Sequence, residues 1–212
     1  DKGSAAAAES VSGEVTYDGA SSFQALVEAA AEKFMDANPD VSVSGSGNGS
    51  GKGLTAVAAG TVTIGNSDVF AETKLEADQV KNLVDHEVAV VGMGPVVSKN
   101  VTVDDLSLEQ LKGIFSGQIT NWKEVGGADA PIVAFQRGVD SGSQTLFKKL
   151  LIDKGDGQLM TAPTELAPAD MGGLVDRIAE YNNSANAIGF SVYYYICLLY
   201  TSDAADDGES VD

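Results

Sequence analysis

The sequence predicts an α/β fold in which ligand-binding loops follow the carboxyl ends of the strands. Short strand-like segments alternate with helical ones from residue 14 onward, an alternation typical of a sheet with helices packed on it. Hydrophobic residues make up 43% of the 212 residues, which is enough for a sizeable core and argues against a disordered chain.

The first half of the chain predicts three strands and two helices. The strands are expected at residues 14–17, 41–44 and 62–65, and the helices from residue 23 to Pro39 and at 54–59. Ser21 or Ser22 is placed to cap the first helix. That helix has an apolar face at helical spacing, formed by Phe23, Leu26, Val27, Ala30, Ala31, Phe34 and Met35.

The second half continues the same alternation. A capping box at Ser107 and Gln110 begins a helix that runs to residue 115. The other expected elements are an extended segment at 87–97, strands at 131–135 and 187–193, and helices at 143–152 and 171–181.

Composition excludes several classes of function. The net charge of −18, from 31 acidic and 13 basic residues, argues against nucleic acid and against docking on an anionic membrane. His86 and Cys197 are the sole residues of their types, so we expect no internal disulfide, no metal site and no cofactor. No pair of carboxylates has acid/base spacing and there is no G-x-S-x-G elbow, so we expect no catalytic residues and no enzyme.

Three helix starts carry serine hydroxyls, and together they predict an anion site. Ser22 precedes the first long helix, Ser50 lies in the glycine-rich loop at 45–53, and Ser141 and Ser143 flank another start four residues beyond Arg137. The loop at 45–53 lacks both the P-loop and the dinucleotide pattern, and alone it favours a plain Ser/Gly loop. Each serine could equally serve as an N-cap. Converging amides, hydroxyls and a guanidinium would enclose a tetrahedral oxyanion.

Asp68 follows the strand at 62–65 and is the unusual member of this group. An ionised carboxylate only accepts hydrogen bonds, so beside an anion it is useful where that anion carries a proton. Monohydrogen phosphate carries one, and sulfate does not. By position alone, a solvated loop aspartate or a helix cap is the better explanation of Asp68.

Three stretches of the sequence carry a resemblance to a known family. Residues 106–147 read LSLEQLKGIFSGQITNWKEVGGADAPIVAFQRGVDSGSQTLF, residues 49–68 read GSGKGLTAVAAGTVTIGNSD, and residues 185–195 read ANAIGFSVYYY. Over residues 15–195 the chain resembles phosphate-transporter substrate-binding proteins. The resemblance implies a two-lobed type II periplasmic-binding-protein fold with two hinge crossings, whose lobes close over phosphate.

The resemblance also implies the residues that bind phosphate. In this sequence they are Ser22, the Phe23 backbone N–H, Ser50, Asp68, Arg137, Ser141, Gly142 and Ser143. Val139 and Asp140 depart from the family's more common acidic-then-glycine pattern, which leaves the shape of this loop open. Gln144 replaces a frequent basic residue.

The expected domain organisation follows from the same resemblance. We expect a flexible tether at 1–13, an incomplete first lobe at 14–90 plus 189–195, and a second lobe at 91–188. The crossings are expected near 88–94 and 188–193, and the unmatched tail at 196–212 should contribute no native packing.

The expected partners are inorganic phosphate and an ABC transporter permease, with no nucleic acid, and the chain is expected to be a monomer. The expected location is extracytoplasmic, either periplasmic or lipid-anchored on the outer face of the membrane. The alternatives are a binding protein for sulfate or molybdate, a phosphatase-type enzyme, which the missing catalytic groups disfavour, and an adhesion module that has lost transport.

Overall fold

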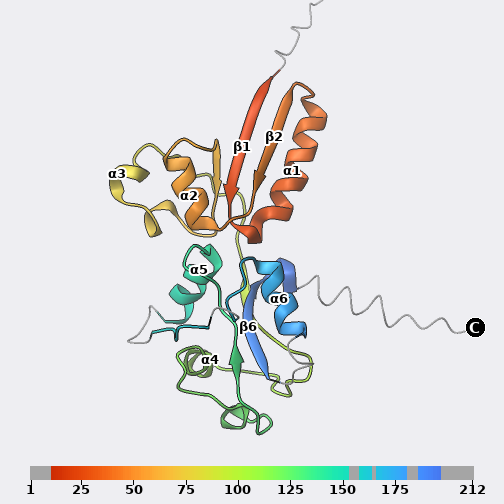
Figure 1. The fold of residues 1–212 in the computed structure, drawn as a ribbon, viewed down its shortest axis with the longest axis vertical. Coiled ribbons are helices and arrows are strands. Elements are labelled where there is room, and N and C mark those ends of the chain that lie inside the picture. Colours follow the sequence, from red (N-terminus) through yellow and green to blue (C-terminus); the bar gives the residue numbers. More distant parts are fainter. Residues whose placement is uncertain (1–10, 153–157, 164–165, 181–185, 197–212) are drawn as a thin grey trace, which may run out of the picture.

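The computed structural model describes residues 11–152, 158–163, 166–180 and 186–196, and shows two α/β lobes stacked end to end (Figure 1). The first lobe is built on the sheet β2-β1-β3 and the second on the sheet β4-β6-β5. The predicted α/β class is therefore confirmed. Within the described residues, no helix is long and apolar enough to cross a membrane.

The first lobe carries parallel strands whose carboxyl ends point toward the second lobe (Figure 1). Its central strand β1 (Gly13–Gly19) lies between β2 (Val41–Ser46) and β3 (Ile64–Asn66). Helix α1 (Gln24–Ala37) packs along β2, and α2 (Ser50–Ala58) packs on β1 and β3. A short α3 (Ala77–Val80) follows. Because parallel strands end at one edge, their loops are delivered together to the face between the lobes.

Helix α1 is less covered than its sequence predicts. None of its residues is buried, and Leu26 and Phe34 are 53% and 46% exposed. The predicted face is present, but among the described elements α1 packs mainly on β2 and on the preceding 3-10 turn. The first lobe therefore presents apolar surface to solvent along this helix.

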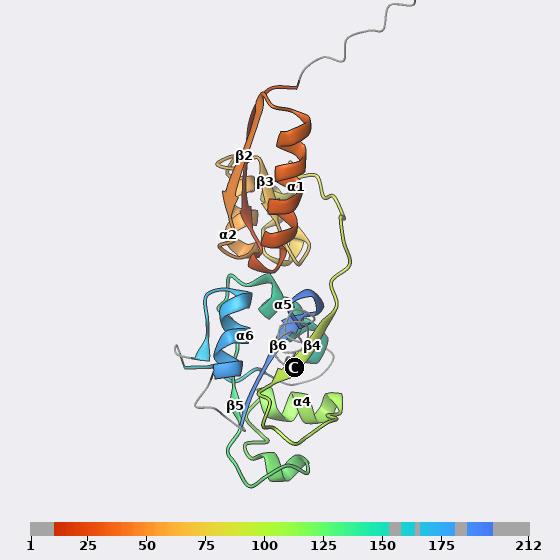
Figure 2. The same cartoon turned by 90° about the vertical axis from the view of Figure 1, so that its right-hand side faces the viewer.

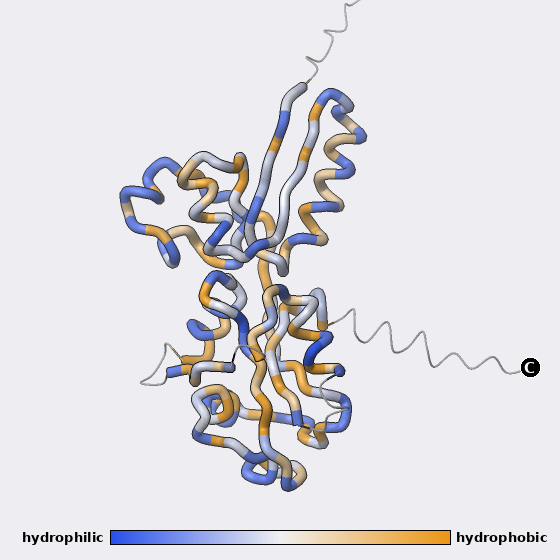
Figure 3. The backbone as a smooth tube through the Cα atoms, viewed as in Figure 1, coloured by the Kyte–Doolittle hydropathy of each residue, from blue (hydrophilic) through white to orange (hydrophobic). Residues whose placement is uncertain are grey.

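The second lobe is organised around one fully buried strand, β6 (Ala187–Val192). It pairs antiparallel with β4 (Met93–Val97) and parallel with β5 (Val133–Ala134). Helix α6 (Met171–Glu180) lies directly on this strand and buries Leu174, Val175 and Ile178, the residues on its apolar stripe. Figure 3 shows hydrophobic residues gathered along these strands. A central strand with both faces covered explains the continuous apolar run in its sequence.

An aromatic cluster joins the remaining helices of this lobe to β6. Phe115 ends α4 (Leu108–Phe115) and Phe147 lies on α5 (Gly142–Leu151). The Phe147 ring stacks on that of Phe190 with centroids 4.1 Å apart, and it meets the Phe115 ring edge to face at 4.7 Å. The capping box predicted at the start of α4 is confirmed.

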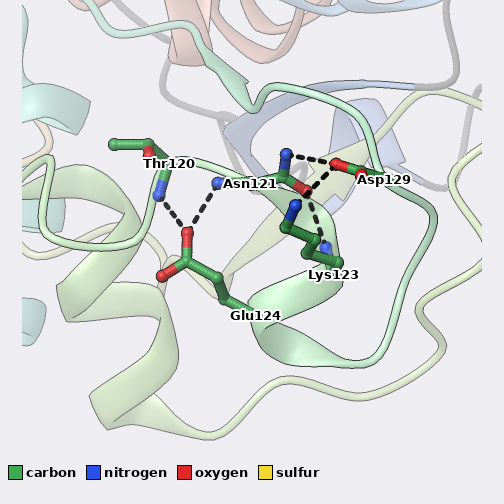
Figure 4. A network of polar contacts seen from close by, with 5 residues as sticks. All are labelled: Thr120, Asn121, Lys123, Glu124 and Asp129. Atoms are coloured by element: carbon green, nitrogen blue, oxygen red, sulfur yellow. Dashed lines mark hydrogen bonds and ion pairs between the residues drawn. The ribbon is translucent and has the colours of Figure 1, made fainter.

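The tip of the second lobe is held by a small polar network (Figure 4). Glu124 Oε1 accepts hydrogen bonds from the N–H groups of Thr120 and Asn121, while Asn121 Nδ2 donates to Asp129 Oδ1. Lys123 Nζ lies 3.0 Å from the same Asp129 oxygen. Hydrogen bonds from Lys123 and Asn121 lower the pKa of Asp129 below its usual value. These contacts close the turn that leads the chain back into β5.

The boundary between the lobes differs from the prediction at one place. The chain leaves the first lobe through an extended segment that reaches β4, as expected for the crossing near 88–94 (Figure 2). Residues 189–192, however, were assigned to the first lobe and lie in the second sheet, where Gly94 pairs with Ser191 and Met93 with Val192. This strand is buried along its whole length, and its two edges pair with β4 and β5. Of the predicted tether and tail, only residues 11–13 and 196 are described.

Candidate functional site

Residues from both lobes meet around the carboxylate of Asp68, which follows β3. Its Oδ1 accepts a hydrogen bond from Ser22 Oγ at 2.6 Å, and its Oδ2 accepts one from Ser143 Oγ at 2.7 Å. The Asp68 N–H donates to Ser50 Oγ at 3.1 Å. Ser22 and Ser50 belong to the first lobe and Ser143 to the second. The carboxylate therefore joins both lobes through short, charge-assisted hydrogen bonds.

The predicted role of serines as helix caps holds for one of the three helix starts. Ser141 is the N-cap of α5 and accepts from the Gln144 N–H at 3.1 Å. Ser21 and Ser22 form a 3-10 turn, η1 (Ser21–Phe23), and make no side-chain cap for α1. The N-cap of α2 is Gly49, whose φ of 108° favours glycine. Ser22 and Ser50 thus contribute their hydroxyls to the site rather than to helix ends.

The Phe23 N–H, which the resemblance assigns to the ligand, has a partner within its own turn. Its N–H donates to the Ala20 carbonyl at 3.1 Å, as expected within a 3-10 turn. This amide is therefore occupied inside η1. The N–H groups of Gly142 and Ser143 stand instead in the first turn of α5, where amides have no partner within the helix.

Gly142 lies at a close approach between the two lobes. A Cβ atom at this position would lie 2.0 Å from Ser50 Oγ and 3.0 Å from the Asp68 Cβ. Only a residue without a side chain fits here. The backbone of Gly142 at the start of α5 therefore packs directly against the Ser50 hydroxyl at the start of α2. Gly142 thus sets how closely the lobes approach, besides offering its N–H group.

Gly142→Ala should weaken ligand binding about 10-fold, because the added methyl group forces the lobes apart at a cost typical of overpacking. Gly138→Ala is the matched control, since a Cβ at Gly138 meets nothing within 4 Å. Titration calorimetry on both variants measures the difference. Equal affinities for the two variants would contradict the steric role of Gly142.

Arg137 is the buried cation of the site. It follows β5, its side chain is 6% exposed, and Nε donates to the Pro168 carbonyl at 3.0 Å. Nη2 donates to the Ala169 carbonyl at 2.7 Å and to Ser21 Oγ at 3.3 Å. Burial lowers the pKa of Arg137 below its ordinary value, while the nearby carboxylates of Asp170 and Asp68 oppose that change.

The guanidinium is not fully satisfied within the described part of the chain. Its Nη1 atom is buried and has no hydrogen-bond partner there. An arginine remains protonated at neutral pH, and a buried charged donor without an acceptor is costly. The geometry therefore suits an anionic oxygen beside Arg137.

Arg137, Asp68 and the serines around Asp68 are together called the anion cage. A pocket of about 270 Å³ adjoins this cage and is lined by residues of both lobes. Asn48 and Lys52 face it from the first lobe, and Arg137, Asp140 and Ser141 from the second. Lys52 and Arg137 give this opening positive charge in a protein whose net charge is −18. Within the described residues, no cluster of His, Cys, Asp or Glu could hold a metal ion.

Several contacts across the lobes were not anticipated from the sequence. The loop at 138–140 receives hydrogen bonds on its carbonyls, from Lys74 Nζ to Val139 O at 2.8 Å and from Gly51 N to Asp140 O at 2.9 Å. On the other side, Tyr195 Oη donates to the Ser21 carbonyl at 3.2 Å. Backbone acceptors carry no residue signature, so no pattern in the sequence could have indicated them.

Comparison with known proteins identifies the family. A model of the PBP superfamily domain matches residues 4–200. The chain belongs to the PBP superfamily. This PBP-superfamily chain is 44% identical over 193 residues to the phosphate-binding protein PstS of Bacillus subtilis (strain 168). That match covers 91% of this chain and 61% of the relative, so the chain spans less than two thirds of the relative's length.

Solved structures confirm the predicted type II architecture of this PBP-superfamily chain. One, described as a phosphate ABC transporter substrate-binding protein from Clostridium perfringens with bound phosphate, matches with a TM-score of 0.71 at 30% identity. This match covers 86% of the present chain and 72% of the Clostridium perfringens chain. An ABC-type phosphate transport receptor from Vibrio cholerae matches with a TM-score of 0.64 at 28% identity, covering 85% and 72% of the two chains.

Proposed function

We propose that this PBP-superfamily chain binds one inorganic phosphate ion between its lobes and acts as the substrate-binding component of a phosphate ABC transporter. The observation that carries the proposal is the Asp68 carboxylate, which accepts hydroxyl hydrogen bonds from both lobes a short way from a buried guanidinium. Phosphate needs both features, since its oxygens accept hydrogen bonds and its hydroxyl donates one.

The proposed complex assigns each group a task. Arg137 Nη1 and the first-turn amides of α5 donate to phosphate oxygens, and the hydroxyls of Ser22, Ser50 and Ser143 turn from their partners in the protein to the ligand. Asp68 accepts the phosphate proton. Ser141 keeps its oxygen on the cap of α5 and donates its O–H. No covalent step is involved, so the chain is a binding protein and not an enzyme.

The relatives support the transport role. The matched proteins are named as phosphate-binding proteins or phosphate transport receptors. We infer that this chain works outside the cytoplasm, delivers phosphate to a membrane permease and acts as a monomer. We further propose a binding site formed by Ser22, the Phe23 N–H, Ser50, Asp68, Arg137, Ser141, Gly142 and Ser143.

The main alternative is a site for sulfate or molybdate. A sulfate or molybdate site requires only hydrogen-bond donors. In such a site an ionised Asp68 would face a ligand oxygen with no proton between the two oxygens. A phosphatase of the metal-dependent kind would need a cluster of metal ligands, and the described residues contain none.

The direct test is isothermal titration of the purified chain with inorganic phosphate in phosphate-free buffer. We expect saturable binding of one ion per chain and a rise in the melting temperature. Absence of both heat and thermal shift at millimolar phosphate, in a chain shown to be folded, would overturn the proposal. Release of phosphate from an aryl phosphate would favour the enzyme alternative.

A further inference from the structure

Ser21 in the first lobe is held by two residues of the second. Tyr195 Oη donates to its main-chain carbonyl at 3.2 Å, and Arg137 Nη2 donates to its hydroxyl at 3.3 Å. Tyr195 packs against the hydrophobic core cluster of the second lobe, to which Phe190 belongs. The carbonyl and the hydroxyl of one buried residue are therefore both contacted from across the boundary between the lobes, in addition to the Gln24 N–H that the carbonyl accepts within its own turn.

The turn that contains Ser21 needs such support. Residues 21–23 form a single 3-10 turn, and no side chain caps it or the helix that follows. Such short turns have poorer hydrogen-bond geometry than an α-helix. Ser22, the next residue, donates to Asp68 at 2.6 Å. The position of Ser21 therefore decides where the Ser22 hydroxyl lies.

Tyr195 is suited to hold this turn. Burial raises the pKa of its phenol above the ordinary value of 10, and the charges of Asp170 and Glu28 add to that effect while Arg137 opposes it. The hydroxyl therefore stays protonated and able to donate at neutral pH. The ring has few rotatable bonds, so it fixes a position at a small cost in conformational entropy.

We propose that Tyr195 is a positioning residue for the anion cage, which holds the Ser21–Ser22 turn from the opposite lobe and so slows ligand release. The inference rests on the proposed function. The hydrogen bond forms only when the lobes are together, and it must break before they separate. Its loss should therefore raise the dissociation rate and leave the association rate unchanged.

The test is stopped-flow measurement of phosphate association and release in Tyr195→Phe, which keeps the ring and its packing. We expect dissociation to be about 3- to 10-fold faster, as for the loss of one neutral hydrogen bond, with association unchanged. Tyr194→Phe is the matched control, because this neighbouring ring is 53% exposed and meets the Tyr195 ring edge to face at 5.3 Å. The melting temperature without phosphate should be similar in both variants.

Hydrogen exchange gives a second readout that does not depend on phosphate. Amides at residues 20–23 should exchange several-fold faster in Tyr195→Phe than in wild type or Tyr194→Phe. A dissociation rate like that of wild type, or a change confined to association, would overturn the role of Tyr195. If wild type binds no phosphate, the proposed function fails, and exchange at residues 20–23 then decides: faster exchange supports the role of Tyr195, and unchanged exchange overturns it.

Discussion

Arg137→Ala should weaken phosphate binding on the order of 10²-fold or more, because removing one partner of a buried charge pair costs about 2–5 kcal/mol. The substitution removes the buried cation at the cage and leaves the Asp68 carboxylate without its positive neighbour. It also leaves the carbonyls of Pro168 and Ala169 without their donor. Calorimetric titration with phosphate measures the loss of affinity, and the melting temperature reports any loss of stability.

Two other variants define what the result means. Arg177→Ala removes an arginine from an exposed position on α6 and should bind phosphate as wild type does. Ser50→Ala should cost less than Arg137→Ala, since a neutral hydrogen bond contributes about 1 kcal/mol and one to a charged group about 1.5–3 kcal/mol. If Ser50→Ala proved more damaging than Arg137→Ala, the roles assigned to the two residues would be wrong.

Asp68→Asn should narrow the preference for phosphate over sulfate, by about 10²-fold or more, chiefly through stronger sulfate binding. In wild type, the carboxylate accepts the phosphate proton but repels a sulfate oxygen, which has no proton to share. Asparagine removes the charge and adds an N–H donor while keeping the size. Its amide oxygen can still accept a hydrogen bond from the phosphate hydroxyl, so phosphate binding should be partly retained.

Competition titrations with both anions decide the outcome. Asp104→Asn makes the same chemical change at an exposed position in the second lobe and should leave the ratio of the two affinities as in wild type. An unchanged ratio in Asp68→Asn would remove this carboxylate from the ligand and favour the sulfate-type alternative.

The helix starts and the strand ends of the site could be predicted from the sequence because both follow from local patterns. Glycine and serine before an amphipathic run mark a helix start, and Asp68 after a short apolar run marks a strand end. Parallel pairing then brings the loops of the first lobe to one edge, and the structure joins Ser22, Ser50 and Asp68 there.

The roles of individual groups were less predictable, because tertiary contacts decide them. Ser21 and Ser22 have the residue type of a helix cap. The Ser21 hydroxyl instead accepts a hydrogen bond from Arg137 of the opposite lobe, and the Ser22 hydroxyl donates one to Asp68. The Phe23 amide is used inside a 3-10 turn that no residue pattern marks. Residues 189–192 were expected in the first lobe, yet β6 pairs with two strands of the second sheet, and no local pattern in the sequence marks those partners.

The position of β6 in the chain sets the order in which the lobes can fold during synthesis. In the part of the chain that the structure describes, the three strands of the first sheet all lie before residue 67 and can pair soon after they leave the ribosome. In the second sheet, β4 and β5 are each bonded to β6 and not to one another, so they wait for a strand that is made much later. Until residue 192 has emerged, both present unpaired edges, and such non-local pairing is slow and prone to aggregation. We therefore expect the second lobe to depend more than the first on protection by chaperones as the chain is made.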